Sequence, residues 1–223
     1  PPTTQPGIDQ LLDRLVSGSS RQKRSTASAL EKVSEQLSNK AEEALKSYSR
    51  DGDDWGAGWI LQILQRHQPA ALEAIPEVSG GWFHAPSSLD IDYTHLQQAL
   101  LREDFEEADR LTSCALRELA GDQAVQRGYV YFSEVPPMES LDLTTIDRLW
   151  VAYSQGRFGF TVQARLLSAL GGRYERLWPK IGWKNEGVWT RYPGSFLWSM
   201  DAPEGHMPLV NQLRGVRLMD ALL

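Results

Sequence analysis

The sequence predicts an all-α protein, built from a helical bundle over residues 1–85 and an all-helical domain over residues 86–223. Three observations predict this fold. Apolar residues recur at helical spacing along most of the chain, Gly and Pro residues interrupt that pattern, and the few candidate strands do not repeat. No apolar run approaches the ~20 residues that are needed to span a bilayer.

The first unit shows three amphipathic stretches. The first ends at Gly18, the second is a long stretch over 25–48, and the third runs over 54–67. Pro69 and Pro76 then end the helical pattern, and a Gly-containing linker follows. We therefore expect a small helical bundle or stacked helix pairs here.

The second unit is also expected to be helical. Its apolar periodicity covers residues 94–102, 104–120, 144–154, 160–170 and 174–178. Asp104 and Glu107 form a capping-box pattern, and we interpret the run of acidic residues around them as a solvated helix start. Short extended pieces are expected at 130–132 and 188–192.

Two long connections, around residues 122–142 and 181–208, interrupt this unit. Long loops in a compact domain often form lids or binding surfaces. Both contain aromatic residues, which leaves two interpretations open: ordinary loop packing, or a flat apolar site. Residues 176–217 are also basic and rich in Trp, although the net charge of the chain is -6. This asymmetry hints at an anionic, aromatic ligand, while the acidic balance argues against nucleic-acid binding.

No catalytic signature is present in the sequence. It lacks a complete dinucleotide fingerprint, a phosphate-binding loop and a nucleophile elbow, so we expect no catalytic residue. Cys114 is the only cysteine, which excludes an intramolecular disulfide and fits a reducing compartment. The four histidines are scattered, and we expect no protein metal site. His206 precedes the C-terminal arginines, where an axial haem ligand and a local hydrogen-bonding residue are both open.

Asn211, Arg214 and Arg217 recur every three residues near the C-terminus. On a helix they would form a slanting polar stripe. The stripe is compatible with a solvated surface, and equally with a fork that binds carboxylates.

Five segments occur in order between about residues 92 and 217: L-D-L-T-T-I-D-R-L-W, S-Q-G-R-F-G-F-T-V-Q, L-W-P-K-I-G-W-K, V-W-T-R-Y-P and A-P-E-G-H-M-P-L-V-N-Q-L-R-G-V-R. Together they resemble the genomes-uncoupled-four family in its cyanobacterial form. The resemblance implies an all-helical core shaped like a cupped hand. It implies non-covalent binding of protoporphyrin IX, Mg-protoporphyrin IX and linear bilins, without a redox cofactor.

The resemblance also implies a role. Members are accessory proteins of magnesium chelatase in chlorophyll biosynthesis, which act with its large porphyrin-binding subunit and are not enzymes themselves. We accordingly expect a monomer in the cyanobacterial cytoplasm, with peripheral association to the thylakoid membrane left open. The alternatives are a haem- or bilin-modifying enzyme that uses His206 and Glu204, and a module that binds a partner helix.

Site residues follow from the resemblance position by position. The matching positions are Asn211, Arg214 and Arg217 in a polar rim, Phe132 and Val135 in a first apolar loop, and Tyr192 and Phe196 in a second. At Tyr192 the cyanobacterial relatives often have Trp. A porphyrin that buries about 300 Å² of apolar surface would gain about 7 kcal/mol before the entropic costs of binding. The resemblance therefore favours the carboxylate fork.

Overall fold

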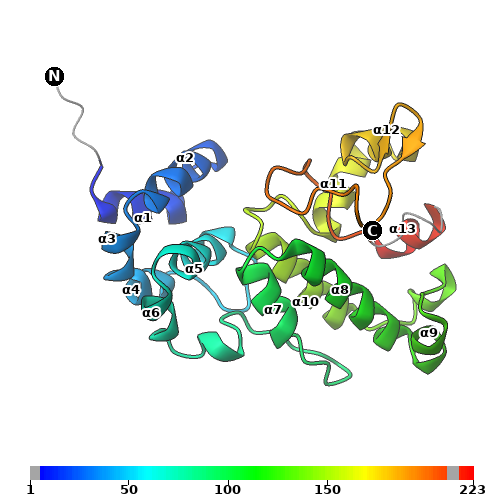
Figure 1. Ribbon diagram of the computed structural model, residues 1–223, viewed down its shortest axis with the longest axis horizontal. Helices are drawn as coiled ribbons and strands as arrows, with labels where there is room; N and C mark the ends of the chain where they lie inside the picture. Colours follow the sequence, from blue (N-terminus) through cyan, green and yellow to red (C-terminus); the bar gives the residue numbers. More distant parts are fainter. Residues whose placement is uncertain (1–5, 210–215) are drawn as a thin grey trace.

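The computed structural model describes residues 6–209 and 216–223 and confirms the all-α prediction. Within these residues the chain is mostly helical, and a single two-stranded antiparallel sheet is its only β structure (Figure 1). None of the described helices is long and apolar enough to cross a membrane.

The amino-terminal part contains six α-helices and one 3₁₀ turn. They are α1 (Ile8–Ser17), α2 (Ser20–Glu31), α3 (Ser34–Ser38), α4 (Ala41–Leu45), α5 (Trp55–His67), α6 (Pro69–Glu73) and η1 (Val78–Gly80). The prediction of one long helix over 25–48 is wrong, because α2, α3 and α4 occupy this stretch. Leu30, Leu37 and Leu45 are all fully buried. The chain turns twice between them so that α2, α3 and α4 can each pack against α5.

Helix α5 joins this part to the rest of the molecule. It packs against α7 and α10, and a Cβ at Gly58 would collide with the backbone carbonyl of Ala152. The buried Gln62 amide donates to the carbonyls of Leu100 at 3.1 Å and Tyr153 at 2.7 Å. One hydrophobic core therefore runs through both parts, and the predicted boundary at residue 85 stays a prediction.

The remaining elements form the carboxy-terminal part. They are α7 (Thr94–Leu101), α8 (Phe105–Ala120), α9 (Asp122–Arg127), η2 (Phe132–Glu134), α10 (Ser140–Ala152), α11 (Phe160–Ala169), α12 (Tyr174–Lys180), β1 (Lys184–Asn185), β2 (Val188–Trp189) and α13 (Val216–Leu222). Strands β1 and β2 pair antiparallel. The extended piece expected at 130–132 is instead interrupted by η2, and α9 fills part of the expected long loop.

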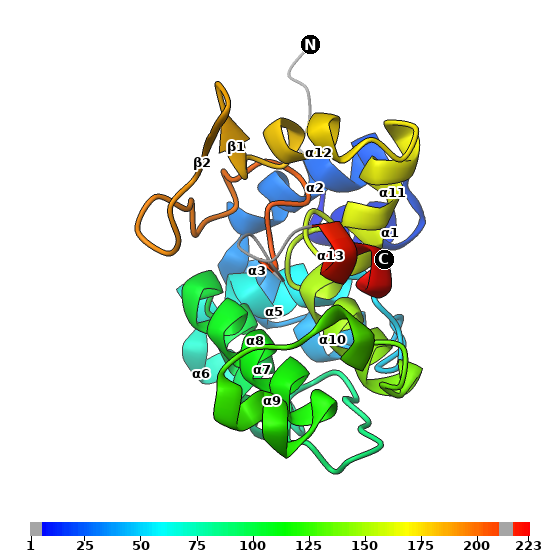
Figure 2. The same cartoon turned by 90° about the vertical axis from the view of Figure 1, so that its right-hand side faces the viewer.

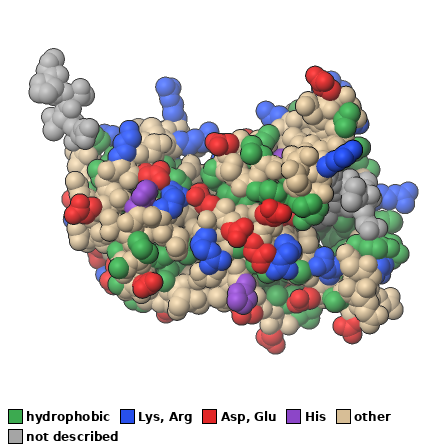
Figure 3. Space-filling view, viewed as in Figure 1, with side chains coloured by type: hydrophobic (Ala, Val, Ile, Leu, Met, Phe, Trp, Pro, Cys, Tyr) green, Lys and Arg blue, Asp and Glu red, His purple; other side chains and the backbone are tan. Residues whose placement is uncertain are grey.

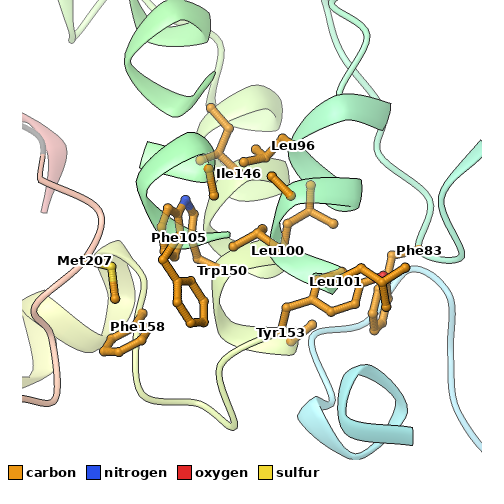
Figure 4. Packing of buried hydrophobic residues seen from close by; sticks show 14 of the residues in the cluster. Phe83, Leu96, Leu100, Leu101, Phe105, Ile146, Trp150, Tyr153, Phe158 and Met207 are labelled. Carbon is orange, nitrogen blue, oxygen red and sulfur yellow. The ribbon is translucent and has the colours of Figure 1, made fainter. Parts of the chain in front are cut away.

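Helices α7, α8 and α10 enclose a dense apolar core. Leu100, Phe105 and Trp150 meet there, as Figure 4 shows, and the Phe105 and Trp150 rings stack with their centroids 6.1 Å apart. Trp150 also donates from Nε1 to the Thr112 hydroxyl at 2.9 Å. The connection over 181–208 and α13 lie above this core, as the second view shows (Figure 2).

The linker between the two parts is fixed to α10 by a buried aspartate. Asp142 is fully buried, and it accepts hydrogen bonds from the backbone and hydroxyl of Ser88 and from the Tyr93 hydroxyl. Although burial raises the pKa of Asp142, these hydrogen bonds bring it below its ordinary value. The carboxylate is thus ionised and fully satisfied.

Candidate functional site

The first loop, which we define as residues 128–139, carries Phe132 and Val135. The Phe132 side chain is 45% exposed, whereas Val135 is 2% exposed and belongs to the core. Helix α13 packs on η2 and places the Arg217 guanidinium 5.3 Å from the centroid of the Phe132 ring. The structure therefore brings Phe132 and Arg217 together at the surface as an aromatic ring beside a cation. Val135 anchors the loop from below.

A network of polar groups stabilises the conformation of the first loop. Arg127 at the end of α9 donates to Glu134 at 2.7 Å, and Glu134 also accepts from the Tyr131 backbone N–H at 2.7 Å. The Tyr131 N–H and the Arg127 guanidinium lower the pKa of Glu134. The same guanidinium lies 3.9 Å from the Tyr131 ring centroid. Arg127 is not among the residues predicted from the sequence. It lies seven residues before Glu134 across an irregular loop, and this spacing gives no helical or strand signal.

The second loop, defined as residues 181–209, carries Tyr192 and Phe196. Tyr192 is 46% exposed, while Phe196 is mostly buried. Their ring centroids lie 6.0 Å apart, and each ring also contacts Trp198, at 6.0 Å and 5.9 Å respectively. The Trp198 indole N–H donates to the Pro193 carbonyl at 3.1 Å. The two predicted aromatic residues therefore belong to one three-ring cluster.

His206 holds the second loop from inside. Its Nδ1 lies 2.6 Å from the Ile181 carbonyl oxygen, and its Nε2 accepts from the Leu197 N–H at 3.3 Å. This pairing requires the proton to sit on Nδ1, and burial lowers the pKa of the imidazole, so the ring is neutral. The Phe196 ring lies against it, with the centroids 5.1 Å apart. Because both ring nitrogens form hydrogen bonds with the backbone and the side chain is buried, His206 has a structural role in this structure.

Asp109 on α8 lies beneath the second loop. Its side chain is only 1% exposed, and Oδ1 accepts a hydrogen bond from the Leu209 backbone N–H at 2.6 Å. Burial raises the pKa of Asp109 to about 7, against the opposing effects of the Leu209 N–H and the Tyr192 hydroxyl. Tyr192 is near enough to influence this carboxyl, yet Oδ2 accepts no hydrogen bond from any group in the described ranges.

Asp109 is not among the residues predicted from the sequence, because it belongs to an acidic run that is typical of a solvated helix start. The other acids of α8 fit that interpretation, and the Asp104 side chain caps the helix by accepting from the Glu107 N–H at 3.3 Å. Asp109, however, shares a helix face with the buried residues Phe105 and Thr112. The spacing of Asp109 from these apolar and buried positions was the signal in the sequence that could have identified it as buried.

Two of the predicted rim residues, Asn211 and Arg214, lie outside the described residues. The described chain stops at Leu209, which is buried, and resumes at Val216. The second loop and α13 both lie above α8 and α10 (Figure 2). In the space-filling view, hydrophobic side chains gather on the right-hand half of the molecule, above a row of charged side chains (Figure 3). No group of three or more His, Cys, Asp or Glu residues in the described parts could hold a metal ion.

Comparisons with known proteins agree on one family. A model of the GUN4-like family matches residues 86–223. The chain is 53% identical over 163 residues to a Ycf53-like protein of Synechocystis sp., an alignment that covers 73% of this chain and 66% of that protein. It is 35% identical over 137 residues to a chloroplastic tetrapyrrole-binding protein of Arabidopsis thaliana, covering 57% of this chain and 52% of that protein. The chain thus spans less than two thirds of the length of these curated relatives.

Solved structures show the same similarity. GUN4 from Chlamydomonas reinhardtii matches with a TM-score of 0.58 at 38% identity, covering 62% of this chain and 90% of that one. Ligand-free GUN4 from Arabidopsis thaliana matches with a TM-score of 0.55 at 35% identity, covering 59% of this chain and 94% of that one.

Proposed function

The chain belongs to the GUN4-like family, and on that premise we propose that it binds a porphyrin non-covalently through its two loops and α13. The ligands are protoporphyrin IX and Mg-protoporphyrin IX, with linear bilins as related candidates. The name of the Arabidopsis relative, a tetrapyrrole-binding protein, supports this ligand class.

The observation that carries the proposal is the pairing of Phe132 with Arg217. A porphyrin has two flat apolar faces and two propionates along one edge. An exposed aromatic ring beside a guanidinium matches both features, because the ring can contact the macrocycle while the guanidinium binds a propionate. Tyr192 offers a second exposed aromatic surface on the other loop. Asn211 and Arg214, which immediately precede α13 in sequence, complete the proposed rim.

The proposed role is that of a non-catalytic regulator. The protein would stimulate magnesium chelatase in chlorophyll biosynthesis, together with the large porphyrin-binding subunit of that enzyme. It would act as a monomer in the cytoplasm of a cyanobacterium, in contact with the thylakoid membrane at times. The similarity to the Synechocystis protein supports the cyanobacterial assignment.

A porphyrin titration tests the binding. Deuteroporphyrin IX, a water-soluble protoporphyrin analogue, and its Mg complex are titrated while Trp fluorescence and the Soret band are followed. We expect saturable binding at micromolar concentration or below. Arg217→Ala should weaken it about tenfold, which corresponds to ~1.4 kcal/mol for an ion pair at a partly wet rim.

Arg14→Ala is the matched control, because Arg14 is an exposed arginine on α1 in the amino-terminal part. It should bind like the wild type. Equal affinities of the folded Arg217→Ala and wild-type proteins would remove Arg217 from the site. A wild-type protein that changes neither signal would contradict tetrapyrrole binding and favour the helix-binding alternative.

A further inference from the structure

We propose that Asp109 is a positioning residue that ties two points of the second loop, its middle and its end, to α8 in the tetrapyrrole-bound form, with the Leu209 N–H on Oδ1 and the Tyr192 hydroxyl donating to Oδ2. This inference rests on the proposed function, since it concerns how the ligand site is held together. Neither the resemblance nor the comparisons point to this residue.

The first half of the tie is present in the structure. The Oδ1 bond to Leu209 at 2.6 Å joins residues 100 positions apart in sequence. Leu209 is buried and stands two positions before Asn211. Asp109, in the second turn of α8, therefore fixes the chain at the end of the second loop.

The second half concerns the unsatisfied oxygen. Oδ2 of Asp109 is buried without a hydrogen-bond partner in the described part of the chain. The Tyr192 hydroxyl already acts on this carboxyl without a ligand: it lowers the pKa of Asp109, while burial raises the pKa of Tyr192 and the Asp109 charge raises it further. Tyr192 is also the exposed ring of the second loop. A ligand that covers this ring would turn its hydroxyl inward, toward the unpaired Oδ2 of Asp109.

The chemistry of the position supports a role beyond packing. A buried carboxylate with an unpaired oxygen costs stability, and an asparagine at the same place would accept from Leu209 without burying a charge. Strongly perturbed carboxyl groups are more common at functional sites than in ordinary cores. Asp109 is such a group, on the helix face that supports the second loop.

A pH dependence of binding follows. A closer hydrogen bond from the Tyr192 hydroxyl to the ionised carboxylate lowers the pKa of Asp109 further on binding, so the ligand is bound with release of a proton. Affinity should then rise with pH up to about 7, the pKa in the free protein, and level off above it. Of the other charged groups, Glu106 raises the pKa of Asp109, and Arg110 opposes Glu106 at Tyr192. His206, on the second loop, has a pKa that burial lowers below its ordinary value.

Binding of deuteroporphyrin IX at pH 6 and pH 8 tests the tie. Wild-type protein should bind about fivefold more tightly at pH 8, within the limit of about tenfold per pH unit for one proton. Asp109→Asn keeps an acceptor for Leu209 but cannot ionise, and Tyr192→Phe keeps the ring without the hydroxyl. Each should abolish the pH dependence, and the double variant should be no weaker than either single one.

Asp147→Asn is the control. Asp147 is another largely buried carboxyl whose pKa burial raises, but it accepts from Thr161 N–H at the start of α11, away from Tyr192. Its pH profile should match that of the wild type. A full pH dependence in folded Tyr192→Phe or Asp109→Asn protein would overturn the tie while leaving porphyrin binding intact. A wild-type protein that does not bind at either pH would instead refute the proposed function, and the tie with it.

Discussion

Two buried aspartates differ in their hydrogen bonds and in the direction of their pKa shifts: Asp142 at the junction between the two parts, and Asp109 beneath the second loop. Asp142 accepts hydrogen bonds from Ser88 and Tyr93 and has a lowered pKa. Asp109 accepts one hydrogen bond, leaves one oxygen unpaired and has a pKa raised to about 7. The same type of side chain is thus fully hydrogen-bonded at the junction and only partly hydrogen-bonded beneath the second loop. Burial alone therefore does not distinguish a structural carboxylate from one with a proposed function, whereas the number of hydrogen-bond donors around the carboxylate does.

The same substitution at both positions should break the comparison most clearly, with the largest effect at the junction. Asp142→Asn replaces an acceptor with an amide that cannot satisfy all the donors around it, so we expect a loss of about 2–4 kcal/mol at pH 7. Urea unfolding measures this loss. Because the pKa of Asp142 is lowered in the folded state, its ionised form stabilises the protein above the ordinary carboxyl pKa, and that contribution disappears as pH falls. The deficit should therefore shrink below about pH 4, and a constant deficit would contradict the account.

The opposite sign is expected at Asp109. Its folded-state pKa is raised from 3.8 to about 7, so the folded protein holds a proton that the unfolded chain has released between these values. Stability contributed by the neutral form is lost as pH rises through this window. Asp109→Asn avoids that loss and should stabilise the ligand-free protein by about 1–3 kcal/mol at pH 8, and by much less at pH 4. Unfolding curves at both pH values measure the difference. A variant that is less stable than the wild type at pH 8 would show that Asp109 is fully satisfied.

The smallest effect is expected at His206, and it sharpens the distinction between holding a loop and holding a ligand. Glutamine can donate to the Ile181 carbonyl and accept from the Leu197 N–H, as the neutral imidazole does. His206→Gln should therefore change the affinity for Mg-deuteroporphyrin by less than about threefold, roughly 0.7 kcal/mol. Soret titration measures it. A selective loss of the Mg complex, with the metal-free porphyrin still bound, would identify His206 as an axial ligand instead.

The sequence predicted the helices wherever an amphipathic pattern coincided with a clear start or stop. Helix α5 begins directly after Asp54, whose side chain accepts from the Gly56 N–H. The stretch over 25–48 failed because its periodicity is that of one helix, yet the chain bends twice to keep the same residues against α5. Periodicity records which residues are buried and does not record where the axis turns.

The site was only partly predictable. Phe132, Arg217, Tyr192 and Phe196 came from the family resemblance, and the structure places each pair in contact. Asp109 lies in a run of acids whose other members are solvated or cap the helix, so composition concealed it. Assigning its face requires the exact register of α8, which the tertiary packing of Phe105 and Thr112 fixes.

Gln62 bears on whether the carboxy-terminal part can be separated from the amino-terminal part. Its one amide group occupies the carbonyls of Leu100 and Tyr153, which close α7 and lie just beyond the end of α10. A fragment excised at residue 86 would lose Gln62 and leave both helix ends without this donor, next to the surface that Gly58 now covers. We therefore expect a fragment that begins at residue 86 to be less stable than the whole chain, and a transplanted domain to be more stable when α5 is included.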